Sequence, residues 1–203
     1  MVGVSLLLLI PGLIILFYIF VFKRDPKLTI PDGDNIISPC DGKVVGIYSS
    51  QDKAVIPKGM LGLINTLTKD VAEKTTIISI MMTPLNVHFQ YAPIQGIVKN
   101  INYFKGKFQN AVNEQSLKIF ENENNQILIE GSYQNKPIKI KVIQIAGILA
   151  RRIKCFVKKE EKINKGQKIG FIDLGSQVTL IIPDTISLKI KVGDKVKPCQ
   201  ALT

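Results

Sequence analysis

The strongest restriction on the fold comes from a series of short runs rich in Val, Ile and aromatic residues, which recur between residues 44 and 192. Several of these runs alternate apolar residues with lysine, as half-buried strands do. The runs are Val44–Tyr48, Thr75–Met81, Gly96–Phe104, Gln126–Glu130, Ile138–Ile145, Ile153–Val157, Val178–Ile182 and Ile186–Val192. Short helices are expected only within Lys58–Asp70 and Asn110–Phe120. The sequence therefore predicts a mainly β (α+β) fold.

The first segment of the chain, from Met1 to Phe22, has no charged side chain. About 20 apolar residues are enough for a helix to cross the hydrocarbon core of a bilayer. The Pro11-Gly12 pair weakens a helix at its middle, so a kinked span and a shallow re-entrant insertion both remain open. A secretory signal peptide is disfavoured, because it would need a basic stretch before the apolar run and small residues at a cleavage site. We expect residues 1–22 to form one N-terminal membrane segment.

The charge distribution indicates where the rest of the chain lies. Lys23 and Arg24 directly follow the apolar segment, and the positive-inside rule then places the following residues on the cytoplasmic side of the cell membrane. Lysine and arginine outnumber aspartate and glutamate by 27 to 16, and the resulting charge of +11 falls entirely within residues 23–203. An excess of this kind facing the inner leaflet favours anionic membrane lipid as a partner. Nucleic acid is not expected, because no recognition-helix or RNA-binding motif accompanies the charge.

The length and the cysteines restrict the domain organisation. A chain of 203 residues with 46% hydrophobic residues is long enough for one well-buried core, so residues 23–203 are expected to form a single domain. The three cysteines, Cys40, Cys155 and Cys199, are widely spaced and form no CxxC pair. Neither a disulfide framework nor a metal site is expected from them.

A faint internal repeat relates Lys162–Gly170 to Lys195–Thr203. Both stretches share the spacing of a basic residue, an aliphatic residue, a turn, a glutamine and an aliphatic residue. Glycine or proline at the bends suits a strand that turns and crosses a flattened β-barrel or sandwich. The pattern resembles the hammerhead strands of biotinyl and lipoyl carrier domains. A carrier function is not expected, because no lysine lies in a Met-Lys-Met or Asp-Lys-Ala context.

Four polar positions stand apart from the β pattern. Asp41 lies in a turn rich in Pro and Gly, where the carboxylate of an aspartate normally caps backbone N–H groups. His88 is the only histidine, and it is either a hydrogen-bonded structural residue or the one group that titrates near neutrality. The Arg151-Arg152 pair is either a solvated strand edge or a phosphate-binding site. The Gly175-Ser176 pair is either an ordinary turn or a site of self-cleavage.

Six blocks in a fixed order carry a resemblance to a known family. They are Phe22–Pro26 (Phe-x-Arg-Asp-Pro), Ser38–Lys43 (Ser-Pro-x-Asp-Gly-Lys), Thr83–Pro93 (Thr-Pro-x-x-Val-His, then Ala-Pro), Asn122–Asn125, Gln144–Ile153 and the Gly175-Ser176 pair. Together these blocks resemble phosphatidylserine decarboxylase, in its short bacterial and archaeal form with a single anchor. The resemblance runs from Phe22 to the C-terminus.

The resemblance implies a self-processing proenzyme. The Ser176 hydroxyl would attack the Gly175 carbonyl, and the chain would then split into a β subunit of residues 1–175 and an α subunit of residues 176–203. Ser176 would become the cofactor, a pyruvoyl group at the N-terminus of the α subunit. The two subunits would form an α/β heterodimer, and a higher oligomer is left open.

The same resemblance implies the reaction and the residues that carry it. The pyruvoyl carbonyl would form a Schiff base with the amine of phosphatidylserine, and loss of carbon dioxide would yield phosphatidylethanolamine for phospholipid biosynthesis. Asp41 and His88 are the implied activators of Ser176. His88 is also the implied acid that protonates the carbanion. Arg151, Arg152 or nearby lysines would hold the lipid phosphate.

One departure from the family pattern concerns the histidine block. Longer members carry Asp-x-His-x-x-His, where this chain has Asn86, His88 and Tyr91. His88 then serves both self-cleavage and decarboxylation, or Asp41 acts on Ser176 more directly. Asn86 also removes a negative charge that would raise the pKa of His88.

Two alternatives to a phosphatidylserine decarboxylase stay open. One is a decarboxylase of another seryl lipid, such as archaetidylserine, because the sequence does not separate one lipid backbone from another. The other is a non-enzymatic, membrane-anchored β-sandwich adaptor. An adaptor of that class would carry a long helical hairpin with heptad periodicity, which the sequence lacks.

Overall fold

An eight-stranded antiparallel sheet forms the body of the protein. The computed structural model describes residues 9–16, 24–52, 61–106, 117–147, 152–173 and 176–203. In spatial order the strands of this large sheet are β11 (Lys195–Val196), β1 (Gly42–Ser49), β2 (Thr75–Met82), β10 (Ser176–Pro183), β6 (Lys136–Ile145), β5 (Asn124–Tyr133), β4 (Gly96–Phe104) and β8 (Lys162–Ile163). Strand β10 is central, because β2 and β6 pair with its two sides. Its residues are buried from Ser176 to Ile182.

A small three-stranded sheet packs against one face of the large sheet. It consists of β3 (Phe89–Tyr91), β9 (Lys168–Ile172) and β7 (Ile153–Cys155), with β9 in the middle. Ile169 and Ile172 of β9 belong to the same buried apolar cluster as Val142, Val178 and Leu180 of the large sheet. The main core therefore lies between the two sheets.

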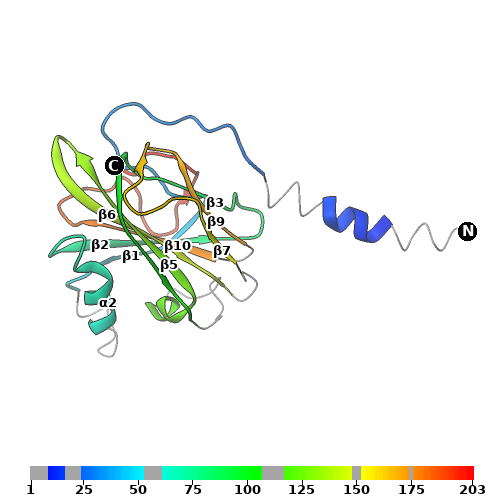
Figure 1. Ribbon diagram of the computed structural model, residues 1–203, viewed down its shortest axis with the longest axis horizontal. Helices are drawn as coiled ribbons and strands as arrows, with labels where there is room; N and C mark the ends of the chain where they lie inside the picture. The colour runs from blue at the N-terminus through cyan, green and yellow to red at the C-terminus, as the bar shows by residue number, and fades with distance from the viewer. Residues whose placement is uncertain (1–8, 17–23, 53–60, 107–116, 148–151, 174–175) are drawn as a thin grey trace, which may run out of the picture.

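The opposite face of the large sheet is covered by helices. Helix α2 (Leu61–Thr68) and the 3₁₀ helix η2 (Leu117–Glu121) supply residues to a second buried cluster, with Ile143 and Ile181 from the sheet. Because side chains alternate along a strand, Leu180 faces the first cluster and Ile181 the second. Figure 1 shows α2 and the small sheet on opposite sides of the central strands. This two-sided burial explains why β10 is apolar almost throughout.

The prediction of a mainly β chain is confirmed, with differences in detail. Both sheets are open in the described part of the chain, with β11 and β8 at the edges of the large one, so the closed-barrel form of the prediction is not observed. The strand predicted at Ile186–Val192 is wrong. This stretch has no strand pairing, and its alternating apolar residues Ile186, Leu188 and Ile190 pack on the core instead.

The predicted helices and the internal repeat have structural counterparts. Helix α2 lies within Lys58–Asp70, whereas Asn110–Phe120 reaches the described residues only at its end, where η2 begins. Each copy of the repeat begins with a two-residue strand, β8 or β11. A turn follows in each copy, and a glutamine side chain closes it: Gln167 Oε1 accepts the Asn164 N–H, and Gln200 Oε1 accepts the Lys197 N–H, both at 3.0 Å.

The N-terminal segment is described only in part. Residues 9–16 are helical, and their large apolar side chains are more than half exposed. Figure 1 shows this helix apart from the β body. Within the described ranges, none of the helices has the length and hydropathy needed to cross a bilayer. The rest of the predicted segment, residues 1–8 and 17–22, lies outside the described residues.

Candidate functional site

Ser176 lies at the start of the most enclosed strand of the protein. It is the first residue of β10, pairs with Met82 of β2, and is fully buried. Its Oγ lies 3.7 Å from the Met82 Sδ. Gly175 lies outside the described residues. The hydroxyl thus sits in a water-excluded environment formed by the core side of the large sheet.

A chain of buried amides connects the Ser176 environment to His88. The Gln90 Nε2 lies 3.8 Å from the Met82 Sδ and donates a hydrogen bond to the His88 carbonyl at 2.7 Å. Gln144 donates to the Gln90 Oε1 at 2.8 Å, and Asn125 donates to the Gln144 Oε1 at 2.9 Å. All of these side chains are buried. Since each amide is held by the next, the network fixes the backbone at His88.

His88 lies where a turn meets the small sheet. The turn closes through Asn86, whose Oδ1 accepts hydrogen bonds from the Thr83 N–H at 2.8 Å and the Thr83 hydroxyl at 2.7 Å. The next residue, Val87, donates its N–H to the Asp41 Oδ2 at 2.9 Å. The His88 carbonyl also accepts the Ile172 N–H at 3.2 Å. The Asp41 carboxylate is thus held against the residue that precedes His88.

The environment of His88 favours the neutral imidazole. Burial lowers its pKa below the ordinary value, and this effect outweighs three opposing ones. These are a hydrogen bond with the Asn86 backbone and the negative charges of Asp173 and Asp41. A buried neutral imidazole near neutral pH can accept a proton.

Asp173 is a site residue that the sequence reasoning missed. It lies one residue beyond Ile172, which bonds to His88, and three residues before Ser176. Its charge acts on His88 more strongly than that of Asp41. A carboxylate therefore stands near the histidine although Asn86 replaces the acid of the longer family members. The available signal was an aspartate between apolar residues directly ahead of the Gly-Ser pair.

The predicted phosphate-binding arginines are only partly placed. Arg151 lies outside the described residues. Arg152 is exposed, and its carbonyl accepts the Asp173 N–H at 3.3 Å, so its backbone borders the site. A third arginine, Arg24, was not predicted as a site residue from the sequence. Its guanidinium lies 4.0 Å from the Asp41 Oδ2 and donates to the Leu85 carbonyl at 3.4 Å.

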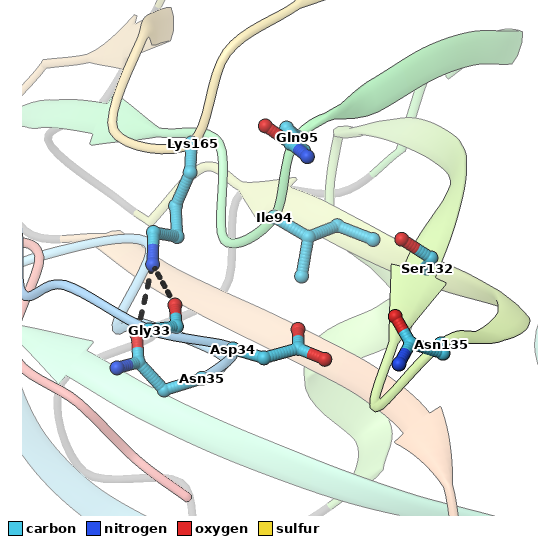
Figure 2. A pocket seen from close by; sticks show the side chains of 8 residues that line it. All are labelled: Gly33, Asp34, Asn35, Ile94, Gln95, Ser132, Asn135 and Lys165. Carbon is cyan, nitrogen blue, oxygen red and sulfur yellow. Dashed lines mark hydrogen bonds between the residues drawn. The ribbon is translucent and has the colours of Figure 1, made fainter.

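A pocket of about 320 Å³ lies away from this site (Figure 2). In it the Lys165 Nζ donates to the carbonyls of Pro31 and Gly33 and to the Asn35 Oδ1. Asn124 marks the end of β5 that lies level with Ser176 in the sheet. Ser132, which lines the pocket, lies eight residues farther along β5, about 26 Å from Asn124. Lys165 fastens the N-terminal stretch to the body there, so this pocket has a structural explanation.

The comparisons with known proteins agree with the motifs. A family model described as phosphatidylserine decarboxylase matches residues 16–203. A Methanocaldococcus jannaschii protein assigned as an archaetidylserine decarboxylase proenzyme is 37% identical, over 93% of this chain and 89% of its own length. The phosphatidylserine decarboxylase proenzymes of Burkholderia lata and Burkholderia cenocepacia are each 32% identical, over 92% of this chain and 78% of theirs.

These matches cover both the buried serine and the histidine turn, and they extend over nearly the whole described β body. A non-enzymatic adaptor is therefore set aside. The chain belongs to the phosphatidylserine decarboxylase family of enzymes.

Proposed function

We propose that the protein is a proenzyme that cleaves itself between Gly175 and Ser176 and then decarboxylates phosphatidylserine to phosphatidylethanolamine. The observation that carries this proposal is the buried Ser176 at the start of β10, joined through Met82 and Gln90 to the turn that holds His88. Nucleophilic attack by a serine needs a neighbouring base, and the neutral imidazole of His88, with the charges of Asp173 and Asp41 acting on it, is the candidate that this connection brings to Ser176. The family membership supports the same assignment.

Self-cleavage begins at the Ser176 hydroxyl. Its Oγ attacks the Gly175 carbonyl carbon, its proton passes to a base, and the Gly175–Ser176 C–N bond breaks to leave an ester and a free amine. A base then removes the Cα proton of residue 176 while the Gly175 carboxylate leaves, which gives a dehydroalanine. Its imine tautomer reacts with water, ammonia leaves, and a keto group remains. The neutral His88 is the favoured base, with Asp41 as its partner.

The residues around Ser176 fit a pyruvoyl group. The group takes the place of Ser176 itself, so it needs no further room. The Met82 thioether beside it and the Gln90 amide that contacts Met82 are uncharged, so a small neutral keto group needs no counter-charge. Once formed, it supplies a carbonyl that takes up the substrate amine and accepts the electron pair released with carbon dioxide. His88 then supplies the proton. The exposed Arg152, with Arg151 beside it in sequence, holds the lipid phosphate outside the buried site.

The subunits are expected to remain together after cleavage. The α subunit, residues 176–203, contributes β10 and β11. Strand β10 pairs over its length with β2 and along most of it with β6, and both partners belong to the β subunit. Apolar burial on both faces of β10 adds to these hydrogen bonds, which supports a stable α/β heterodimer.

The lipid backbone of the substrate is the open part of this proposal. Archaetidylserine and phosphatidylserine carry the same phosphoserine headgroup, and the reacting atoms lie in that headgroup. The Methanocaldococcus jannaschii relative is assigned to the former and the Burkholderia relatives are named for the latter. We favour phosphatidylserine because the family model carries its name. The site is expected at the cytoplasmic side of the membrane, where the net charge of +11 favours anionic lipid.

The proposed function is tested by intact mass and by product analysis of the full chain. We expect two fragments, one ending at Gly175 and one with a pyruvoyl N-terminus in place of Ser176. Vesicles with phosphatidylserine should yield phosphatidylethanolamine and carbon dioxide. An archaetidylserine substrate in a parallel assay identifies the preferred backbone. A single uncleaved chain that produces no carbon dioxide from either lipid would refute the proposal.

Replacing Asp173 with Asn is expected to shift the pH dependence of self-cleavage. Because the Asp173 carboxylate raises the pKa of His88, its loss lowers that pKa further, and the neutral base is then present at lower pH. The rise of the cleavage rate with pH should therefore move to lower pH in Asp173→Asn. The measurement is the rate of fragment formation across the pH range.

Two further variants separate this electrostatic effect from a structural one. Asp184→Asn removes a carboxylate just beyond Pro183, the far end of β10, and should leave the profile unchanged. Asn86→Asp in the Asp173→Asn background restores a carboxylate near His88 and should move the profile back. An unshifted profile in Asp173→Asn would show that its charge does not act on the cleaving base.

A further inference from the structure

The outer face of the small sheet combines aromatic rings with lysines. Phe89, Phe171 and Lys154 occupy neighbouring register positions on β3, β9 and β7. The two rings pack edge-on with centroids 5.1 Å apart. The Lys154 Nζ lies 5.9 Å from the Phe171 centroid, and the Lys168 Nζ lies 4.7 Å from the Phe89 centroid. Cation–aromatic pairs of this kind hold the lysines above the sheet.

Two large apolar side chains extend this face into solvent. Phe156 packs on Phe89, with ring centroids 6.4 Å apart, and is 46% exposed. Leu85 is 66% exposed, in the turn that leads to His88. Exposed apolar and aromatic side chains beside lysines are typical of surfaces that lie in a membrane interface. We call Leu85, Phe89, Lys154, Phe156 and Lys168 the docking face.

The N-terminal stretch of the chain joins the body at this same place. Asp25 forms an ion pair with Lys168, and Arg24 bonds to the Leu85 carbonyl. The exposed apolar helical residues 9–16 precede this junction in the chain. Both the apolar segment and the docking face can therefore meet one bilayer.

The docking face also borders the candidate site. The Phe171 ring, which lies between Lys154 and Phe89 in the register, has its centroid 6.3 Å from that of His88. Arg24, at the junction, lies 4.0 Å from Asp41. A membrane against this face would thus bring lipid headgroups next to the buried site, and they would not need to cross the body of the protein.

We propose that the docking face seats the protein on an anionic bilayer, with Leu85 and Phe156 in the headgroup region and Lys154 and Lys168 against lipid phosphates. Charge complementarity selects this occupant, because Lys154, Lys168, Arg24 and Arg152 surround the apolar residues. Asp25 pairs with Lys168 and Asp41 lies 4.0 Å from Arg24, so these four cations outnumber the two carboxylates that pair with them. The choice of a lipid surface as the partner rests on the proposed function. The contact with the bilayer is measured by an experiment that does not need decarboxylase activity.

The orientation of the protein on the bilayer can be measured with a label on a natural cysteine. Cys155 of β7 is exposed, whereas Cys40 and Cys199 are buried, so a thiol-reactive fluorophore should label Cys155 on the folded full-length chain. The probe is a vesicle of phosphatidylcholine and phosphatidylglycerol with a nitroxide-bearing lipid. Docking predicts strong quenching of this label by the nitroxide, and less quenching at high salt, which screens surface charges.

A label at the opposite end of the large sheet provides the matched control. Lys136, the first residue of β6, is exposed and lies nine residues along that strand from Ile145, hence about 30 Å from the site end of the strand. The same fluorophore in Cys155→Ser/Lys136→Cys should show little quenching. Equal quenching at both positions, or stronger quenching at 136, would overturn the proposal.

Vesicle partitioning measures the contribution of the face. Lys154→Gln/Phe156→Ser should bind anionic vesicles at least about fivefold more weakly, the effect expected from one lysine at such a surface. The charge-matched Lys136→Gln should bind as the wild type does. Unchanged partitioning of the double variant would count against the proposal.

Activity assays then distinguish a loss of membrane docking from a loss of catalytic chemistry. The double variant should retain cleavage at Gly175-Ser176 and turnover of a dispersed short-chain seryl lipid, and should lose activity only on vesicles. Equal losses on both substrates would assign these residues a structural role. If the wild type produced no carbon dioxide at all, the proposed function would fail, while the quenching result would still decide the docking.

Discussion

Ser176→Ala is expected to leave the protein as one chain of 203 residues without decarboxylase activity. The substitution removes both the nucleophile of self-cleavage and the atoms from which the reactive carbonyl arises. Losses on the order of 10⁴-fold or more follow when the nucleophile of such a site is removed. Intact mass reports the cleavage, and release of carbon dioxide from phosphatidylserine vesicles reports the activity.

The fold should tolerate this change. Ser176 is fully buried, and its hydroxyl makes a weak contact with the Met82 Sδ at 3.7 Å, so alanine leaves no strongly bound partner unsatisfied. Ser79→Ala is the matched control. Ser79 is a buried serine on the neighbouring strand β2, with its Oγ 3.5 Å from that of Thr179, and its loss should leave cleavage and turnover intact. Fragments or product from Ser176→Ala would exclude the serine mechanism.

The elements of the fold could be predicted from local pattern, but their arrangement could not. Val178–Ile182 is recognisable as a strand from its composition. Its central position depends on pairing with β2 and β6, which lie about 100 and 35 residues away in the sequence. The stretch Ile186–Val192 shows the opposite case. It alternates like a strand, yet its apolar side chains reach the core without a hydrogen-bonded partner strand.

The candidate site divides in the same way. Asp41, His88 and Ser176 stand in recognisable motifs, and in the structure the Asp41 carboxylate accepts the N–H of Val87, the residue before His88. Asp173 was missed because its relation to His88 arises only when β9 pairs with β3. Gln90 was missed because its buried amide gains its meaning from contacts with Met82 and the His88 backbone. Side chains that act through long-range contacts carry at most a weak local signal, such as the aspartate ahead of the Gly-Ser pair.

His88→Gln is expected to reduce decarboxylation by roughly 10²- to 10⁴-fold, the usual contribution of a general acid or base. Glutamine keeps a polar side chain in this fully buried position and avoids the cavity that alanine would leave. Rates are compared per pyruvoyl-bearing chain, counted by intact mass. Full turnover by His88→Gln would show that another group supplies the proton.

The same variant decides how many steps His88 serves. Slow cleavage together with slow decarboxylation per pyruvoyl-bearing chain assigns the histidine to both reactions, whereas normal cleavage with slow decarboxylation leaves Asp41 to act on Ser176. The lowered pKa of His88 favours the first outcome, since burial keeps the imidazole neutral and able to accept the Ser176 proton. That neutrality has a consequence for the second reaction. A single buried histidine that acts first as a base must bind a proton before it acts as an acid, so wild-type decarboxylation should slow as the pH rises above the pKa of His88.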